Sequence, residues 1–163
     1  MEGWEFSLRL FYQASRILYV NKTYNHYRYN PNSLSKVVSE KNALYIRDSL
    51  VEIHKFIQTM PESDKYRFKN RINQRTQYAI LAVAMSTYFH PNNKLKYHEK
   101  MHRFDTLINE NEVFYDALAV IDYSIFDKKR AISLFCIKRK MYWLLPIISR
   151  VKSFLSKKGI RSY

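Results

Sequence analysis

The chain is poor in glycine and cysteine and has no long apolar run. Of its 163 residues only Gly3 and Gly159 are glycine. A nucleotide-binding α/β domain uses more glycine in its phosphate loops and tight turns, so we do not expect a complete one here. The single cysteine, Cys136, cannot form an internal disulfide, and we expect a buried thiol in a reducing, cytoplasmic setting. No apolar run approaches the roughly 20 residues that a membrane span needs.

The composition indicates a packed, basic protein. Apolar residues make up 47% of the chain and aromatic residues 16%, which is enough for a hydrophobic core and excludes a disordered class. The net charge is +14, from 28 Lys and Arg against 14 Asp and Glu. This excess favours an anionic partner, namely nucleic acid, an anionic membrane surface or phosphate groups.

From residue 40 onward the apolar residues have helical spacing. The first such stripe contains Ala43, Ile46, Leu50, Ile53, Ile57 and Met60. Pro61 is expected to end this helix, and Ser63 to cap the next one, which covers 66–89. Further helices are predicted over 97–108, 113–126 and 128–139, the last of them capped by Asp127.

The first 40 residues differ from the rest. The spacing of Trp4, Leu8 and Tyr12 predicts a short amphipathic helix over 3–14. The apolar run 17–20 predicts a short buried strand, and the alternation over 24–30 a second extended segment. The predicted fold class is therefore mainly α. A small α/β remnant (1–40) precedes a helical bundle (41–140) and a basic amphipathic tail (141–163).

Two blocks in this N-terminal region carry a motif. The first is Glu2-Gly3-Trp4-Glu5-Phe6-Ser7-Leu8-Arg9-Leu10, and the second is Tyr24-Asn25-His26-Tyr27-Arg28-Tyr29-Asn30-Pro31-Asn32-Ser33-Leu34-Ser35. Their order and spacing resemble the end of the catalytic domain of bacterial family 2 glycosyltransferases. In that family an acidic pair precedes a W-x-F-S-L-R helix, a strand follows, and a Y-x-Y-R-x-N-x-x-S-x-S segment comes next. The resemblance covers residues 1–40, about a quarter of the chain.

The resemblance implies a fold and a reaction. The fold would be the end of a nucleotide-diphospho-sugar transferase α/β sheet. The reaction would be inverting transfer of a sugar from a nucleotide sugar to a saccharide or lipid-linked acceptor in cell-surface polysaccharide synthesis. Such a transfer needs a carboxylate base for the acceptor proton and a divalent cation, Mn or Mg, for the leaving diphosphate.

The chain departs from the family pattern at two places. Gly3 occupies the position of the usual base, which leaves Glu2 as the candidate base. The sequence contains no Asp-x-Asp, so the metal site of the family is absent from this chain. We expect the donor-binding domain and its cation upstream, with Met1 an internal or truncated start. We therefore expect no cofactor in this chain and no activity of this chain alone.

Three residues of the second block are candidate contacts to the donor diphosphate or to the acceptor. They are His26, Arg28 and Ser33. An arginine guanidinium offers a planar fork of donors to phosphate oxygens, and a Ser/Asn loop adds hydroxyl and amide groups. The alternative interpretation is a solvated surface strand that ends in a turn.

A histidine motif favours a structural interpretation. His98-Glu99-Lys100-Met101-His102 fits the H-E-x-x-H pattern of zinc-dependent proteases. The match is short and no third ligand is evident nearby, so surface histidines on a basic helix are the favoured interpretation and no metal site is predicted.

The C-terminal segment favours a membrane surface. From 128 to 163 it contains eleven Lys and Arg and no Asp or Glu. Its candidate membrane-surface residues are Trp143, Arg150, Lys152, Lys157 and Lys158. Basic residues interleaved with apolar and aromatic ones are typical of a helix lying in an anionic interface, here the inner face of the plasma membrane. The alternative is a helix packed on the bundle.

Two alternative functions remain beside the glycosyltransferase. One is a peripheral membrane module without chemistry. The other is a nucleic-acid-binding module in which the aromatic residues of 24–29 stack on bases. Nucleic acid is the less favoured partner, because the positive charge is concentrated in a tail beside apolar residues.

Overall fold

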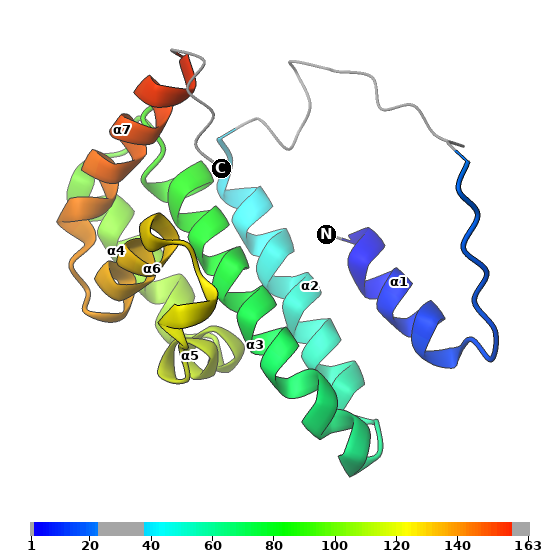
Figure 1. Ribbon diagram of the computed structural model, residues 1–163. Coiled ribbons are helices and arrows are strands. Elements are labelled where there is room, and N and C mark those ends of the chain that lie inside the picture. Colours follow the sequence, from blue (N-terminus) through cyan, green and yellow to red (C-terminus); the bar gives the residue numbers. More distant parts are fainter. Residues whose placement is uncertain (1, 23–37, 158–163) are drawn as a thin grey trace.

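The computed structural model of the protein describes residues 2–22 and 38–157, and this part is mainly helical (Figure 1). The α-helices are α1 (Glu2–Gln13), α2 (Glu40–Gln58), α3 (Glu62–Val83), α4 (Tyr97–Asn109), α5 (Glu112–Ala119), α6 (Lys128–Lys138) and α7 (Leu145–Lys157). Three short turns join them, namely the π-helical η2 (Ala84–Tyr88) and the 3₁₀ turns η3 (Tyr123–Ile125) and η4 (Tyr142–Leu144). Side chains are described for 5–22 and 38–151. The prediction of a helical bundle is confirmed.

Helices α2 and α3 form a long hairpin along which the other helices pack (Figure 1). The buried side of α2 is the predicted stripe, and Leu50 and Ile53 have no exposed surface. Pro61 is the N-cap residue of α3, and its carbonyl accepts from the backbone N–H groups of Asp64 and Lys65. Ser63 therefore lies inside the first turn of α3, and its predicted capping role is wrong.

Two groups of buried side chains stabilise the bundle. The larger one surrounds Phe104 of α4 and collects apolar residues from α2, α3, η2 and all later helices. The smaller one lies near the α2–α3 turn and contains Ile53, Ile57, Met60 and Ile72, against which Leu8 and Tyr12 of α1 pack. Helix α1 thus docks on the hairpin through one face.

The segment after α1 differs from the prediction. A buried strand was expected over 17–20, but these residues are irregular and exposed, with Leu18 79% and Tyr19 84% accessible. A strand needs a neighbouring strand for its backbone groups, and 2–22 and 38–157 contain none. The predicted second extended segment, 24–30, lies outside the described residues.

Helix α5 is shorter than expected. The prediction of one helix over 113–126 is wrong beyond Ala119, because the Asp122 side chain accepts from the backbone N–H of Ser124 and starts the turn η3. Asp127 caps α6 as predicted, accepting from the N–H groups of Lys129 and Arg130. None of the helices in the described ranges combines the length and the apolar composition that a membrane span requires.

Candidate functional site

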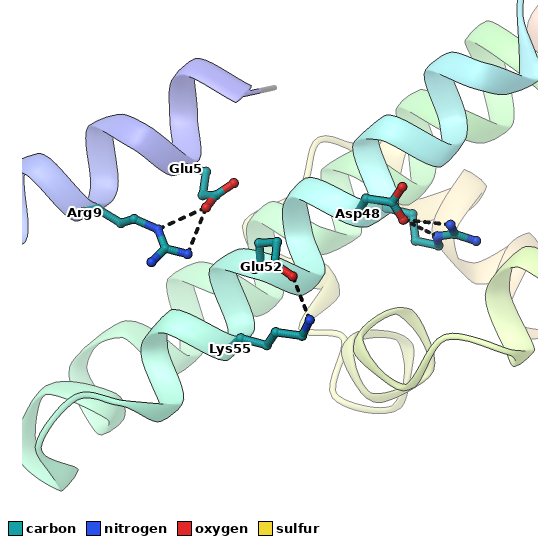
Figure 2. A network of polar contacts seen from close by, with 6 residues as sticks. Glu5, Arg9, Asp48, Glu52 and Lys55 are labelled. Carbon is teal, nitrogen blue, oxygen red and sulfur yellow. Dashed lines mark hydrogen bonds and ion pairs between the residues drawn. The ribbon is translucent and has the colours of Figure 1, made fainter.

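The motif-bearing helix α1 is held to the bundle by polar contacts. Arg9 forms an ion pair with Glu5 one turn earlier (Nη2 to Oε1, 2.9 Å), and its guanidinium lies 4.8 Å from the centre of the Phe56 ring. Figure 2 shows this pair together with the Glu52–Lys55 pair of α2. The Tyr12 hydroxyl donates to Asp64 of α3 at 2.7 Å, and this hydrogen bond raises the pKa of Tyr12. Arg9 and Tyr12 therefore contact the bundle, whereas the Glu5–Arg9 pair lies within α1 itself.

The predicted catalytic and substrate-contact side chains lie outside those that the structure describes. Glu2 is the first residue of α1, but its side chain is not among those described. His26, Arg28 and Ser33 lie outside the described residues. Their roles therefore stay predictions.

The outer side of α1 is apolar and uncovered. Phe6 and Leu10 lie opposite the docked residues and are 68% and 53% accessible. The exposed apolar segment 17–20 begins four residues after the end of α1 at Gln13. Exposed apolar patches of this kind are characteristic of interaction surfaces.

A first cleft, which we name the Glu40 cleft, lies where α2 begins and η2 ends. Its volume is about 400 Å³, and Glu40, Tyr88, Lys94 and Arg103 line it. The Glu40 carboxylate accepts from the Tyr88 hydroxyl at 3.1 Å and from the Arg103 guanidinium at 2.7 Å. Burial and the nearby Glu40 charge raise the pKa of Tyr88 well above its ordinary value, so the phenol stays protonated.

The wall of the Glu40 cleft is shaped by the π-helical turn. The N–H of Phe89 donates to the carbonyl of Ala84, five residues earlier, and Asn93 donates to the carbonyl of Thr87. π-Helical turns are frequent at functional sites. The cleft can hold a small polar ligand beside Lys94 and Arg103. In the sequence, the break at Asn92–Asn93 is the one local sign of this cleft.

A second, smaller cleft lies between the start of α4 and α7, and we name it the Arg150 cleft. Its volume is about 150 Å³, and His90, Tyr97, Lys100, Pro146 and Arg150 are among its lining residues. None of its described lining residues is acidic. Burial lowers the pKa of His90. Of the predicted membrane-surface residues, Arg150 contributes to this cleft.

Helix α7 and the turn before it expose an apolar stripe. Trp143, Ile147 and Val151 follow each other at intervals of four residues and are 58%, 53% and 53% accessible. Leu145 and Ser149 point to the buried side. Lys152 and Lys157 lie in α7 with side chains outside the described set, and Lys158 lies outside the described residues.

The histidine motif lies on α4. His98 and His102 are exposed, and the intervening Glu99 accepts from the backbone N–H of Lys96 and helps to cap the helix. Among the residues that the structure describes, no group of three or more His, Cys, Asp or Glu could hold a metal ion. These residues therefore do not fit the divalent cation that the resemblance implies.

A partly buried histidine makes stability depend on pH. His54 of α2 has a buried Nε2 atom without a hydrogen-bond partner. Desolvation lowers the pKa of His54, and the charge of Asp116 on α5 opposes this in part.

We expect the protein to lose stability as the pH falls below about 6.5, where histidine in the unfolded chain takes up a proton that folded His54 resists. In urea unfolding experiments, His54→Gln should reduce the loss of unfolding free energy at acid pH. The remaining loss comes from His90, whose pKa is also lowered. Identical pH profiles for the two proteins would contradict the assignment.

Comparisons of the chain with models of known protein families, with curated proteins and with solved structures gave no match in any of the three.

Proposed function

We propose that this chain is the C-terminal helical portion of a family 2-like glycosyltransferase that transfers a sugar from a nucleotide sugar to a saccharide or lipid-linked acceptor. The proposal rests on the combined motif of residues 2–35. One structural observation supports it, namely that the outer apolar side of α1 and the nearby run 17–20 are both exposed.

This surface fits a missing α/β domain. Helix α1 uses Leu8 and Tyr12 to dock on the bundle and leaves Phe6 and Leu10 for a second partner. The run 17–20 has the composition of a strand but no described neighbour to pair with. In the proposal, the donor-binding sheet of the whole enzyme takes up this run as its last element, which would complete the predicted α/β remnant.

In this proposal the α/β domain and the helical bundle have different roles. The α/β domain would hold the nucleotide sugar and the Mn or Mg ion, and the bundle would hold α1 in place through Arg9, Phe56 and Asp64. The proposed catalytic base is a carboxylate at the start of α1, with Glu2 as the candidate in this sequence. This chain alone is then expected to be inactive.

The test compares this chain with the product of the reading frame extended upstream of the Met1 codon. We expect the extended product to contain an α/β domain with Asp-x-Asp. We expect it to release nucleotide from a nucleotide sugar with Mn or Mg, whereas this chain alone should not.

In the extended product, Phe6→Ser with Leu10→Ser should lower the activity and the thermal stability. The matched control is Tyr66→Ser, at an 83% accessible aromatic on α3, and should change neither. A stop codon directly upstream, or nucleotide release by this chain alone, would refute the proposal.

A second function, peripheral binding to an anionic membrane, is favoured by the stripe Trp143, Ile147 and Val151. The stripe lies in a segment without acidic residues. An exposed apolar stripe beside basic residues is typical of helices that lie in a membrane interface. This function is compatible with the first, since a lipid-linked acceptor would lie at that surface. The vesicle experiment below tests it.

A further inference from the structure

The Arg150 cleft gathers cationic and neutral donors from three parts of the chain. His90 follows η2, Lys100 lies in the first turns of α4, and Arg150 lies in α7. The Tyr97 side chain lies beside them. Because no described lining residue is acidic, the cleft has no internal counterion and favours an anion.

The donor groups suit the oxygens of a phosphate. The Lys100 ammonium gives one of its three protons to the carbonyl of Asn93 at 2.7 Å and has two left. Nδ1 of His90 accepts from the N–H of Asn92 at 3.1 Å, which leaves the proton of the neutral ring on Nε2. The Arg150 guanidinium adds a planar fork of donors that matches phosphate geometry.

The size of the cleft limits what it can hold. About 150 Å³ is roughly five times the share of one water molecule in the liquid. It is below the roughly 300–1,000 Å³ of pockets that enclose whole small molecules. A single phosphate group fits this space, whereas a nucleotide or an oligosaccharide does not.

The position of the cleft on α7 identifies the source of the phosphate. Pro146 and Arg150 line the cleft, and Ile147 and Val151 of the apolar stripe directly follow them in the chain. Successive residues of a helix lie about 100° apart, so the cleft and the stripe are adjacent on α7. A phosphate here would have apolar side chains next to it, as the headgroup of a lipid does.

We infer that the Arg150 cleft binds the headgroup phosphate of an anionic phospholipid while Trp143, Ile147 and Val151 insert among the neighbouring acyl chains. The inference rests on the membrane function proposed above. It adds a defined phosphate site, made by Lys100, Arg150 and His90, to a surface that would otherwise bind through diffuse charge.

The experiment measures binding to vesicles of phosphatidylcholine with and without phosphatidylglycerol. Lys100→Gln with Arg150→Gln is expected to weaken binding to the phosphatidylglycerol vesicles roughly tenfold or more. The matched control, Lys69→Gln with Arg71→Gln, removes the same charge from the exposed side of α3 and should cost less than roughly threefold. Arg150→Gln alone, at an exposed position, should weaken binding in the same direction without affecting folding, which circular dichroism checks.

Further arms separate the cleft from the stripe and lipid from free phosphate. Trp143→Ser with Ile147→Ser should abolish vesicle binding while inorganic phosphate still shifts the His90 imidazole resonances. Equal losses in the two charge variants would overturn the cleft and leave the membrane function standing. Full vesicle binding by the serine variant would overturn the insertion of Trp143 and Ile147 among the acyl chains. A wild-type protein that responds to inorganic phosphate but ignores phosphatidylglycerol vesicles would overturn the lipid inference.

Discussion

Phe104→Ala is expected to lower the free energy of unfolding by about 3–5 kcal/mol, because it removes the ring at the centre of the larger core. Phe104 has no exposed surface. Its ring meets Phe89 edge-on at 5.4 Å and Tyr142 edge-on at 5.5 Å, and it lies 5.6 Å from the Tyr88 ring. Tyr88 lies in η2, Phe89 directly follows it, and Tyr142 lies in η4, so a cavity at 104 loosens α4 from both of these turns.

Urea unfolding followed by circular dichroism measures this loss. Phe104→Leu, which keeps part of the volume, should fall between the wild type and the alanine variant and remains informative if alanine prevents folding. Tyr115→Ala, at an exposed aromatic on α5, is the control and should stay within about 0.5 kcal/mol of the wild type. A loss below about 1 kcal/mol for Phe104→Ala would show that the ring is not central to the core.

Helix α2 could be predicted from the sequence because its evidence is local. The steps from Ala43 through Leu50 and Ile57 define one face, and Pro61 limits the helix whatever surrounds it. That face proved to be the buried one.

The strand predicted over 17–20 failed for the opposite reason. Its apolar residues have strand propensity, but a strand exists only if another backbone completes its hydrogen bonds. No described segment does so, and the run is exposed. Propensity can identify such a run but cannot supply its partner.

The ends of two helices depended on unusual local geometry. The π-helical bond from Phe89 to Ala84 adds one residue to a turn, which the apolar spacing does not reveal. Helix α6 ends because Lys140 adopts φ 55°, with the N–H of Met141 bonded to the carbonyl of Cys136. Glycine is the usual residue at such a position, so the sequence does not indicate this geometry, although the end predicted at 139 lies one residue from the observed Lys138.

The candidate clefts could not be predicted from the sequence, because their lining residues come from distant parts of the chain. Lys100 and Arg150 are 50 positions apart in the chain, and only the packing of α7 beside η2 places them around one cleft. The apolar character of α7 was visible in the sequence. Which of its residues face outward was not, because buried Leu145 and exposed Ile147 are both aliphatic.

Gln77→Glu is expected to lower the free energy of unfolding at neutral pH by about 3 kcal/mol or more, because it places a carboxylate in the core. Gln77 of α3 is 1% accessible, and its Nε2 donates to the carbonyl of Ala117 at 2.7 Å. Ala117 lies in the last turn of α5, where carbonyls have no donor within the helix. The Gln77 amide is thus a cap supplied by another helix, and its Oε1 has no partner.

The protonation state of the introduced carboxyl group makes this prediction testable. A carboxylate has no proton to donate to the Ala117 carbonyl, so a carboxylate oxygen and the carbonyl oxygen face each other without a hydrogen bond. A protonated carboxyl group can donate its O–H to that carbonyl. The loss relative to the wild type should therefore shrink as the pH is lowered toward about 4, near the ordinary pKa of glutamate. Gln77→Met, which leaves the carbonyl unpaired without adding charge, should cost about 1–3 kcal/mol with no such recovery. Urea unfolding at both pH values decides the matter: equal losses for the Glu and Met variants at neutral pH would mean that water reaches this site and that Gln77 does not cap α5.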